Sequence, residues 1–559
     1  MNHRRRFLHA APALIALAGM PARAAGTDNA AAASGSASTG RTPPIWPKPN
    51  PYLSAREYAI AHFDPAQTDT FSYPIPKGEF RVDLSRQLHI PGGPINIMTL
   101  ASARPGFMWA VSSNRVGFVD ARNGGWKLVA EKRIPGAQDV SAEGMRALLA
   151  TRYANVETLT ADCIKVVGPH PTEATGNGLY TVVDADDTVY ANARSVLHAF
   201  ALVDRDDPAK GIHIARSFDI PGVLRPLTLP GSPPVNQIVG LGMTYDGHLV
   251  VGSPTGVAVV DRGFRDKPAA YSIEEDQFVS NSFAIDDRNG IYLASGSFKP
   301  RGDGIMRKLV WTGTRLSENE VDGAWSSPYD GGDWPPAIKS GTGTGATPTL
   351  MGFAEDENRF VVITDGADRM KIVAFWRDRI PADFVQKPGT KSRRIADQMP
   401  ITAGLPASTK WVQSEQSVVV NGFGAFVVNN VVAEGVHDKL IGVLAMGPLL
   451  PPATGVERVE WHIAERRWKS VWTRSDVVSI STVPAASASS GIVIVNGYTK
   501  KQGWEITGLD WSTGKNVTRV LFGHDTRGNG AYSILQFLEG DELLFNSIGG
   551  PYRIPLGKV

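Results

Sequence analysis

Short apolar stretches alternate with polar or glycine-rich loops along most of the chain. The clearest copies are two paired stretches, at residues 236–252 and 281–295. A turn dipeptide divides each pair, Asp246-Gly247 in the first and Asn289-Gly290 in the second. These dipeptides supply the positive φ that two-residue hairpin turns need, and the flanking apolar residues are typical of strands. The pattern therefore predicts antiparallel hairpins with a defined register.

Units of this kind recur through the chain at uneven spacing. Further copies begin near Asn96, Asn177, Ala346, Glu415, Val477 and Gly530. A spacing of about 40 to 80 residues is typical of β repeats that carry loop insertions. Radial repetition protects strand edges, which favours a closed ring over an open sandwich of this size. We therefore expect an all-β fold, a β-propeller of about eight blades, with seven blades as the alternative.

The first 24 residues have the three parts of an export signal. Arginines at positions 4 to 6 precede an apolar run from Ala10 to Met20, and small residues surround Ala24. Two arginines, one further residue and Phe7-Leu8 resemble the twin-arginine motif, whose translocon carries folded proteins. A general secretion signal is the alternative. Both interpretations predict a signal peptide over 1–24 and a periplasmic or secreted mature protein.

The composition changes twice before the first repeat. Residues 25–51 are first rich in Ala, Ser and Gly and then rich in Pro, which predicts a flexible linker. The N-terminal segment 52–81 is unusually polar, and we expect it either to fold over one mouth of the propeller as a lid or to pack on its rim. Its polar residues include His62, Asp64 and Asp69. Residues 52–559 are then a single propeller domain.

The charge of the chain changes when the leader is set aside. The formal charge is +2, and the leader contains four arginines and no acid, so the remaining residues carry −2. No basic stripe with interleaved aromatic residues is present, so we do not expect nucleic-acid binding. Beyond the leader no apolar run approaches the roughly 20 residues that cross a bilayer, so we expect no membrane span.

The chain contains one cysteine, Cys163, in the largely apolar stretch 159–167. One cysteine cannot form an intrachain disulfide. We expect a buried, unreactive thiol. The alternative, a catalytic nucleophile, would need a nearby base.

In a propeller, the loops that lead into the innermost strands converge on one funnel. These loops carry seven polar residues: Asn96, Asn177, Asn236, Asn281, Thr347, Glu415 and Asn529. A ring of amide and carboxylate oxygens suits Ca²⁺, which takes about six to eight oxygen ligands. The predicted metal ligands are Glu415, Asn281, Asn236 and Asp365. The alternative is that the asparagines cap turns and strand starts.

Two further places could carry acid and base chemistry. Asp365 and Asp368 follow an apolar strand and could act as metal ligands or as an acid and base pair; a solvated turn is the alternative. His524 lies in a glycine-bounded loop before the last repeat, where it would suit a general base, and Arg527 could stabilise a developing negative charge. The alternative for His524 is an exposed loop residue.

Three segments resemble the docking repeat of quinoprotein-type propellers, in which Asp, a turn, Gly-Lys and an aromatic or apolar residue tie one blade to the next. They are residues 509–515, 119–127 and 461–468. Residues 281–295 are also similar to strands of lactonase and strictosidine-synthase-like propellers. The order of the segments around 67–70, 343–349 and 364–368 resembles a group of exported bacterial propellers without a settled activity. The resemblance implies a propeller fold and, as an alternative cofactor, the quinone PQQ.

Three hypotheses about function follow. The first is an enzyme that acts on a small organic molecule in the axial funnel, by metal-assisted hydrolysis of a lactone or ester. The second is a quinone-cofactor oxidoreductase. The third is a non-catalytic propeller that binds a protein partner or a cell-envelope component, and it predicts an exposed apolar patch and an empty or narrow channel.

Overall fold

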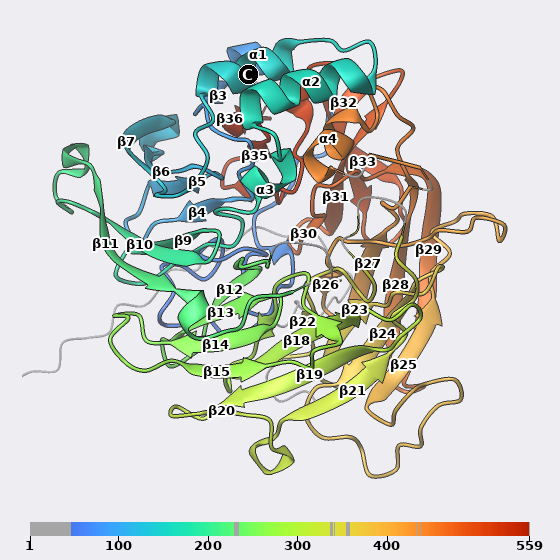
Figure 1. The fold of residues 1–559 in the computed structure, drawn as a ribbon. Coiled ribbons are helices and arrows are strands. Elements are labelled where there is room, and N and C mark those ends of the chain that lie inside the picture. Colours follow the sequence, from blue (N-terminus) through green and yellow to red (C-terminus); the bar gives the residue numbers. More distant parts are fainter. Residues whose placement is uncertain are drawn as a thin grey trace, which may run out of the picture. The chain divides into compact units, whose positions relative to one another are not determined.

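The computed structural model describes residues 46–228, 234–335, 339, 341–353, 358–432, 434–436 and 438–557, all within one compact unit, 44–559. The predicted signal peptide and the predicted linker up to residue 45 lie outside the described residues. The strands form eight sheets, most of them built from four consecutive antiparallel strands (Figure 1). This succession of small meandering sheets confirms the propeller fold.

The first four sheets in chain order contain the following strands. Sheet 1 has β4 (Thr99–Ala101), β5 (Phe107–Val111), β6 (Arg115–Asp120) and β7 (Lys127–Arg133), and sheet 2 has β8 (Val182–Val183), β9 (Val189–Ala193), β10 (Val196–Leu202) and β11 (Ile212–Asp219). Sheet 3 has β12 (Gly240–Met243), β13 (Leu249–Ser253), β14 (Gly256–Val260) and β15 (Ala269–Ser272). Sheet 4 has β16 (Gln277–Phe278), β17 (Ala284–Ile285), β18 (Gly290–Ser297), β19 (Gly304–Trp311), β20 (Leu316–Ser317) and β21 (Trp325–Tyr329).

The other four sheets include strands from both ends of the described chain. Sheet 5 has β22 (Thr349–Met351), β23 (Phe360–Thr364), β24 (Lys371–Trp376) and β25 (Ile395–Pro400), and sheet 6 has β26 (Val419–Asn421), β27 (Gly424–Val428), β28 (Thr454–His462) and β29 (Arg467–Val478). Sheet 7 has β30 (Ala485–Ser487), β31 (Ile492–Thr499), β32 (Gly503–Asp510) and β33 (Asn516–Gly523), flanked by β1 (Thr70–Phe71) and β2 (Gly78–Arg81). Sheet 8 has β34 (Gln536–Leu538), β35 (Glu542–Ser547), β36 (Gly550–Pro555) and β3 (Leu88–His89).

The burial of each strand follows its place in the sheet. The second and third strands, such as β13, β14 and β23, are buried along their whole length, because neighbouring sheets cover both of their faces. The outer strand β11 instead alternates between exposed and more buried residues, as expected when one face meets water. Runs of Val, Ile and Leu therefore mark the middle of each sheet.

The hairpins are present, but their turns are longer than predicted. In the first, Thr244 N–H donates to His248 O, so three residues form the loop and only Gly247 has a positive φ, of 88°. In the second, Asp286 N–H donates to Gly290 O, and Asn289 takes the positive φ, of 63°. The prediction of two-residue turns is wrong, because one left-handed residue closes a three-residue loop.

Tryptophans tie neighbouring sheets together at two of the predicted docking segments. Trp126 Nε1 donates to Pro551 O at 3.2 Å, which joins sheet 1 to sheet 8. The Trp511 ring packs on Gly424 of sheet 6, where a Cβ atom would lie 2.8 Å from the ring. These contacts support the fold and carry no evidence about a quinone.

Within the described ranges, four α-helices interrupt the β architecture, and the all-β pattern did not predict them. They are α1 (Ala142–Ala150), α2 (Val156–Val167), α3 (Pro171–Thr175) and α4 (Lys439–Ala445), and they gather near the top of Figure 1. Cys163 is fully buried in α2, and burial raises the pKa of its thiol to about 12, so the interpretation as a buried thiol is confirmed. In the described part of the chain, no helix is long and apolar enough to cross a membrane.

Candidate active site at the channel axis

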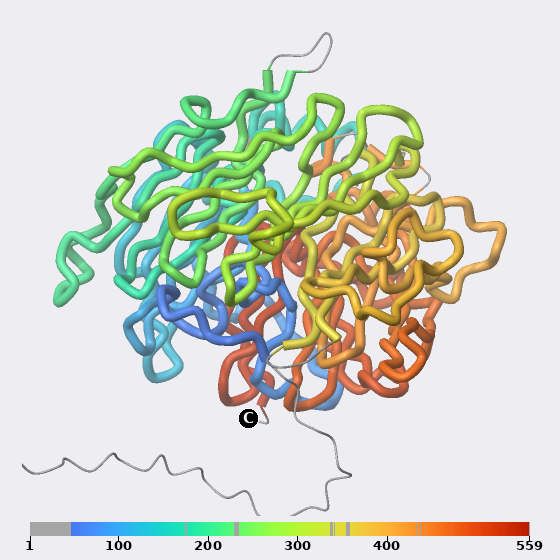
Figure 2. Tube along the Cα trace, turned by 90° about the horizontal axis from the view of Figure 1, so that it is seen from below, coloured from blue at the N-terminus to red at the C-terminus, as the bar shows by residue number. Residues whose placement is uncertain are grey.

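Residues 50–71, which we call the axial segment, bond to the innermost strands of the sheets and belong to the dark-blue part of the trace in Figure 2. Six backbone carbonyls of the axial segment accept hydrogen bonds from backbone N–H groups of the sheets. The pairs are Tyr58 with Ala101, Ala59 with Val183, Pro65 with Ile285, Ala66 with Leu350, Thr68 with Val420, and Asp69 with Ala486. These six donors lie in the innermost strands of sheets 1, 2, 4, 5, 6 and 7. Asn50 Nδ2 donates to Met243 O of sheet 3, and the Tyr58 hydroxyl donates to Phe537 O of sheet 8.

The axial segment therefore contacts every sheet and occupies the axis. The hydrogen bonds of residues 58–69 go to the innermost strands of the sheets, a finer placement than the predicted lid or rim packing specified. Asn50 is buried and held by sheet 3, so the predicted flexible linker does not extend to Pro51.

The backbone of the axial segment is strained. Five of its non-glycine residues have positive φ: Tyr58 (67°), His62 (59°), Phe63 (75°), Gln67 (61°) and Asp69 (53°). A left-handed conformation costs an L-residue about 1–2 kcal/mol. Such strain persists only where the surrounding contacts impose it, and it gathers at functional sites.

His62 and Asp69 form a buried pair within this segment. His62 Nδ1 lies 2.8 and 3.0 Å from the two carboxylate oxygens of Asp69, and the two residues are 4% and 0% exposed. The pair places the proton on Nδ1 and leaves Nε2 as an acceptor. Burial raises the pKa of the Asp69 carboxyl, and the contact with His62 opposes that rise.

His62 Nε2 faces a polar layer that leads toward solvent. It lies 3.5 Å from Thr347 Oγ1, which in turn donates to Asn281 Oδ1 at 3.1 Å. The Tyr180 hydroxyl donates to the same Asn281 oxygen, and Asn281 Nδ2 donates to Gly345 O. Thr347 is buried, whereas Asn281 and Tyr180 are half-buried. One buried residue, Thr347, thus links His62 to the half-buried Asn281.

Glu415 forms an ion pair with the first residue of α4. Its Oε2 atom is 3.0 Å from Lys439 Nζ, and its backbone N–H donates to Asn430 Oδ1. The residues before and after the β26–β27 hairpin, Glu415 and Asn430, therefore lie in contact. Among the described residues, the buried atoms Glu415 Oε1 and Tyr532 OH have no hydrogen-bond partner. Burial and the Glu415 charge raise the pKa of Tyr532.

A buried lysine completes this set of axial groups. Lys339 Nζ lies 3.3 Å from Gln413 Oε1, and burial lowers the pKa of its ammonium to about 8, against the opposing charges of Asp365 and Glu415. Several ionisable groups with shifted pKa values thus gather at the axis, which is typical of a functional site.

The two predicted aspartates occupy different environments. Asp365 is buried 2.6 Å from Lys371 Nζ, and burial raises the pKa of its carboxyl while Lys371 opposes the rise. Asp368 is half-buried, with Oδ2 3.9 Å from a guanidinium nitrogen of Arg301. Asp368 therefore belongs to the surface of the loop and Asp365 to its interior.

The predicted calcium ligands do not form a suitable donor set. Glu415 is paired with Lys439 and Asp365 with Lys371, and the Asn281 oxygen accepts from two hydroxyls. Asn236 is half-buried before β12. Over the described ranges, no three His, Cys, Asp or Glu residues are grouped so that they could hold a metal ion. Ammonium groups already neutralise the carboxylates, so these residues do not fit Ca²⁺.

Other residues of the predicted ring act as caps or as interelement contacts. Asn177 Oδ1 accepts from Arg194 N–H, Asn96 Nδ2 donates to Asn546 Oδ1, and Asn529 Nδ2 donates to Val443 O of α4. These contacts agree with the capping alternative.

His524 and Arg527 lie beside the helices. His524 is exposed, and its Nδ1 atom is 2.8 Å from the Tyr498 hydroxyl oxygen. Arg527 Nε is 2.9 Å from both carboxylate oxygens of Asp525, so its charge is already paired. No contact in the described residues joins either residue to His62, Asn281 or Glu415.

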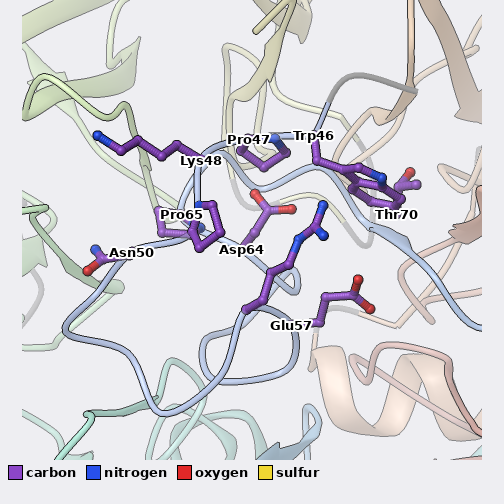
Figure 3. A pocket seen from close by; sticks show the side chains of 10 residues that line it. Trp46, Pro47, Lys48, Asn50, Glu57, Asp64, Pro65 and Thr70 are labelled. Atoms are coloured by element: carbon purple, nitrogen blue, oxygen red, sulfur yellow. The ribbon is translucent and has the colours of Figure 1, made fainter. Parts of the chain in front are cut away.

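Asp64 is a buried carboxyl in the middle of the axial segment. Its carboxylate accepts from Ala66 N–H and Thr68 Oγ1, and Figure 3 shows it among the side chains of a very small pocket that includes Trp46 and Glu57. Burial raises the pKa of Asp64 to about 7. Asp64 is thus protonated or ionised according to conditions near neutrality.

Sequence reasoning noted His62 and Asp69 as polar residues but did not place them at the axis. It missed Tyr180, Lys339, Lys439 and Tyr532 altogether. The one available signal was the density of polar residues ahead of the first repeat.

No family model matches the chain. It is 33% identical over 293 residues to an uncharacterized protein of Archaeoglobus fulgidus, a match that covers 50% of this chain. The chain spans about half the length of that relative, 53%. Among solved structures, the chain is similar to Sqt1 of Saccharomyces cerevisiae (11% identity, TM-score 0.38, 66% of this chain and 80% of that chain). It is also similar to a putative 6-phosphogluconolactonase of Bacteroides fragilis (10% identity, TM-score 0.36, 76% and 92%). The propeller class rests on the sheets themselves.

Proposed function

We propose that this protein is an exported hydrolase that opens a small lactone or ester at the channel axis, with His62 as general base. The observation that carries the proposal is the position of His62 between Asp69 and Thr347. A base that is oriented by a carboxylate and faces a hydroxyl is the arrangement that hydrolysis needs. The 3.5 Å between His62 Nε2 and Thr347 Oγ1 is long for a hydrogen bond, so both atoms keep the capacity to bond to a water molecule.

Water is the nucleophile in this proposal. Thr347 donates its proton to Asn281, so its oxygen can accept a hydrogen bond from water and hold that water beside His62 Nε2. His62 takes one proton from the water, and the oxygen bonds to the carbonyl carbon. The C–O bond to the leaving oxygen then breaks, and His62 returns the proton to that oxygen. An ester yields an acid and an alcohol, and a lactone yields one hydroxy acid.

The test is hydrolysis of a panel of γ- and δ-lactones and aryl esters by the purified mature protein. His62→Gln should lower kcat by about 10²–10⁴-fold, the usual contribution of a general base. His213→Gln is the matched control, because His213 is exposed on β11 and should keep full activity. A panel without any hydrolysed member, or a His62→Gln variant as fast as the control, would refute the proposal.

The proposal that the protein is exported rests on its N-terminal sequence motif alone. Arg4→Lys together with Arg5→Lys should retain the protein in the cytoplasm if the twin-arginine route is used. Cell fractionation of the full-length chain measures this directly, and unchanged export would favour the general secretion route.

A second candidate function is partner binding. An apolar groove of about 640 Å³ runs past Leu405, Trp411, Val431 and Leu450. A Trp411→Asp variant should then lose a partner that wild type retains from a native envelope extract. The quinone alternative rests on the sequence resemblance, and an absorbance scan after addition of PQQ tests it.

A further inference from the structure

A second pocket lies between the helices and the loops of sheets 7 and 8. We call it the cap pocket, and its volume is about 180 Å³. Its walls come from α1, α2 and α4, from the loops that follow α1 and α4, and from sheet 7 with the loop after it. Leu148, Leu159 and Leu444 belong to the helices, and Tyr498 and His524 to sheet 7 and the loop that follows it. The pocket shares no lining residue with the His62 site.

The inner wall of the cap pocket is aliphatic. Leu148, Leu159 and Leu444 are at most 4% exposed, and the half-buried Leu449 adds to the same wall. A surface of this kind favours a hydrocarbon chain over a polar ligand, because burial of each methylene removes apolar area from water.

The outer edge carries positive and donor groups. Arg152 and His524 line the pocket and are exposed, and the Tyr498 hydroxyl lies beside His524 Nδ1. No Asp or Glu is among the lining residues, and Arg152 forms no ion pair within the described part of the chain. An unpaired guanidinium above an aliphatic wall is suited to a carboxylate with a hydrocarbon tail.

We propose that the cap pocket binds a linear monocarboxylate, with its carboxylate at Arg152 and its tail against the leucines. A cavity of about 150 Å³ is known to hold a benzene molecule, so this pocket accommodates about six to eight non-hydrogen atoms of the tail. The site is independent of the proposed hydrolysis, since His62 lies at the axis.

The experiment is calorimetric titration of the mature protein with octanoate, octan-1-ol and octylamine. Octanoate should bind at least about tenfold more tightly than the alcohol, because a charge-assisted hydrogen bond contributes more than a neutral one. The amine should bind most weakly. Equal affinities for octanoate and octylamine, or no octanoate binding, would overturn the proposal.

Variants then test the two parts of the site, the carboxylate position at Arg152 and the tail position against the leucines. Arg152→Gln should lower the affinity for octanoate about tenfold and leave the affinity for octan-1-ol unchanged. Arg146→Gln on the exposed side of α1 is the matched control, since Arg146 does not line the pocket. Leu449→Trp should fill the pocket and weaken both ligands. Binding by Arg152→Gln that equals binding by the Arg146→Gln control contradicts the proposed carboxylate position.

Chain length tests the aliphatic wall. From butanoate to octanoate, each methylene should tighten binding about fourfold, the fold-change that corresponds to about 0.8 kcal/mol. The gain should level off when the tail exceeds the pocket. An affinity independent of chain length would contradict a tail held by the leucines.

Discussion

The axial segment and the helices each supply side chains to a candidate site, but their backbones are held in opposite ways. The axial segment is irregular, with five left-handed non-glycine residues, and its backbone groups bond to the sheets. Helices α1, α2 and α4 are regular and begin at the side-chain caps Ser141, Asn155 and Asp438. A regular helix satisfies its own backbone, so it is free to present leucines, whereas the strained segment depends on its surroundings and presents polar groups.

The difference also appears in the charges. Asp64 and Asp69 in the axial segment are buried, and burial raises the pKa of both carboxyls. By contrast, Arg152 and His524 beside the helices are exposed. Chemistry that needs shifted pKa values is therefore expected at the axis, and reversible ligand binding at the helices.

The largest expected effect is at Asp69. In Asp69→Asn the amide would present an N–H to His62 Nδ1, so the imidazole proton would move to Nε2 and the base would be lost. A fall in kcat of up to about 10⁴-fold follows for such a tautomer change. Asp525→Asn beside the helices is the control. Steady-state rates on the best substrate of the panel would contradict the assignment if the two variants were equally active.

The next effect is on stability. Phe63 is fully buried, with its ring centroid 4.9 Å from that of Tyr58 and 5.7 Å from that of Phe71. Phe63→Ala should lower the free energy of unfolding by about 3–5 kcal/mol. Chemical denaturation monitored by tryptophan fluorescence measures this loss. A loss below 1 kcal/mol would indicate that the axial segment detaches without disturbing the sheets.

A smaller effect distinguishes the axial carboxyl from surface carboxyls. The folded Asp64 keeps its proton up to a pKa of about 7, while the unfolded chain releases it near 3.8. The native state thus binds more protons between these values, and the free energy of unfolding falls as pH rises from about 4 to 7. Asp64→Asn should remove part of that fall and stabilise the protein at pH 8 by about 2 kcal/mol.

The control for this measurement is Asp139→Asn, since Asp139 is exposed before α1. The curve of the thermal unfolding midpoint against pH, from pH 4 to pH 8, should be parallel for wild type and Asp139→Asn. The curve for Asp64→Asn should be flatter. Parallel curves for all three proteins would contradict the raised pKa of Asp64.

The smallest effect is local to the helices. Ser141 Oγ accepts from Gly144 N–H at the start of α1. Ser141→Ala should cost about 1 kcal/mol and speed amide exchange in α1, with hydrolysis at the axis unchanged. Loss of activity in this variant would show that the two regions are coupled.

Local pattern was sufficient to predict the repeats, because each hairpin pairs residues that are close together in the sequence. It was not sufficient for the axial segment, whose partners lie far away in sequence: Asp69 O, for example, accepts from Ala486 N–H. The stretch 159–167 was recognised as apolar but not as part of a helix, since periodicity over nine residues does not separate a buried helix from a strand. His524 was chosen because it lies in a loop before the last repeat. In the structure this loop lies beside the helices and not at the axis.

The pairing of β3 with β36 has a consequence for biosynthesis. The ribosome makes β3 early, but its partner ends at residue 555, so sheet 8 stays incomplete until nearly the whole described chain has been translated. β1 and β2 likewise wait for β30 and β33. Such distant pairings fold slowly and leave strand edges open in the meantime. Nascent chains halted before β36 should therefore be prime substrates for chaperones and proteases, and the axial segment must await enclosure after translation.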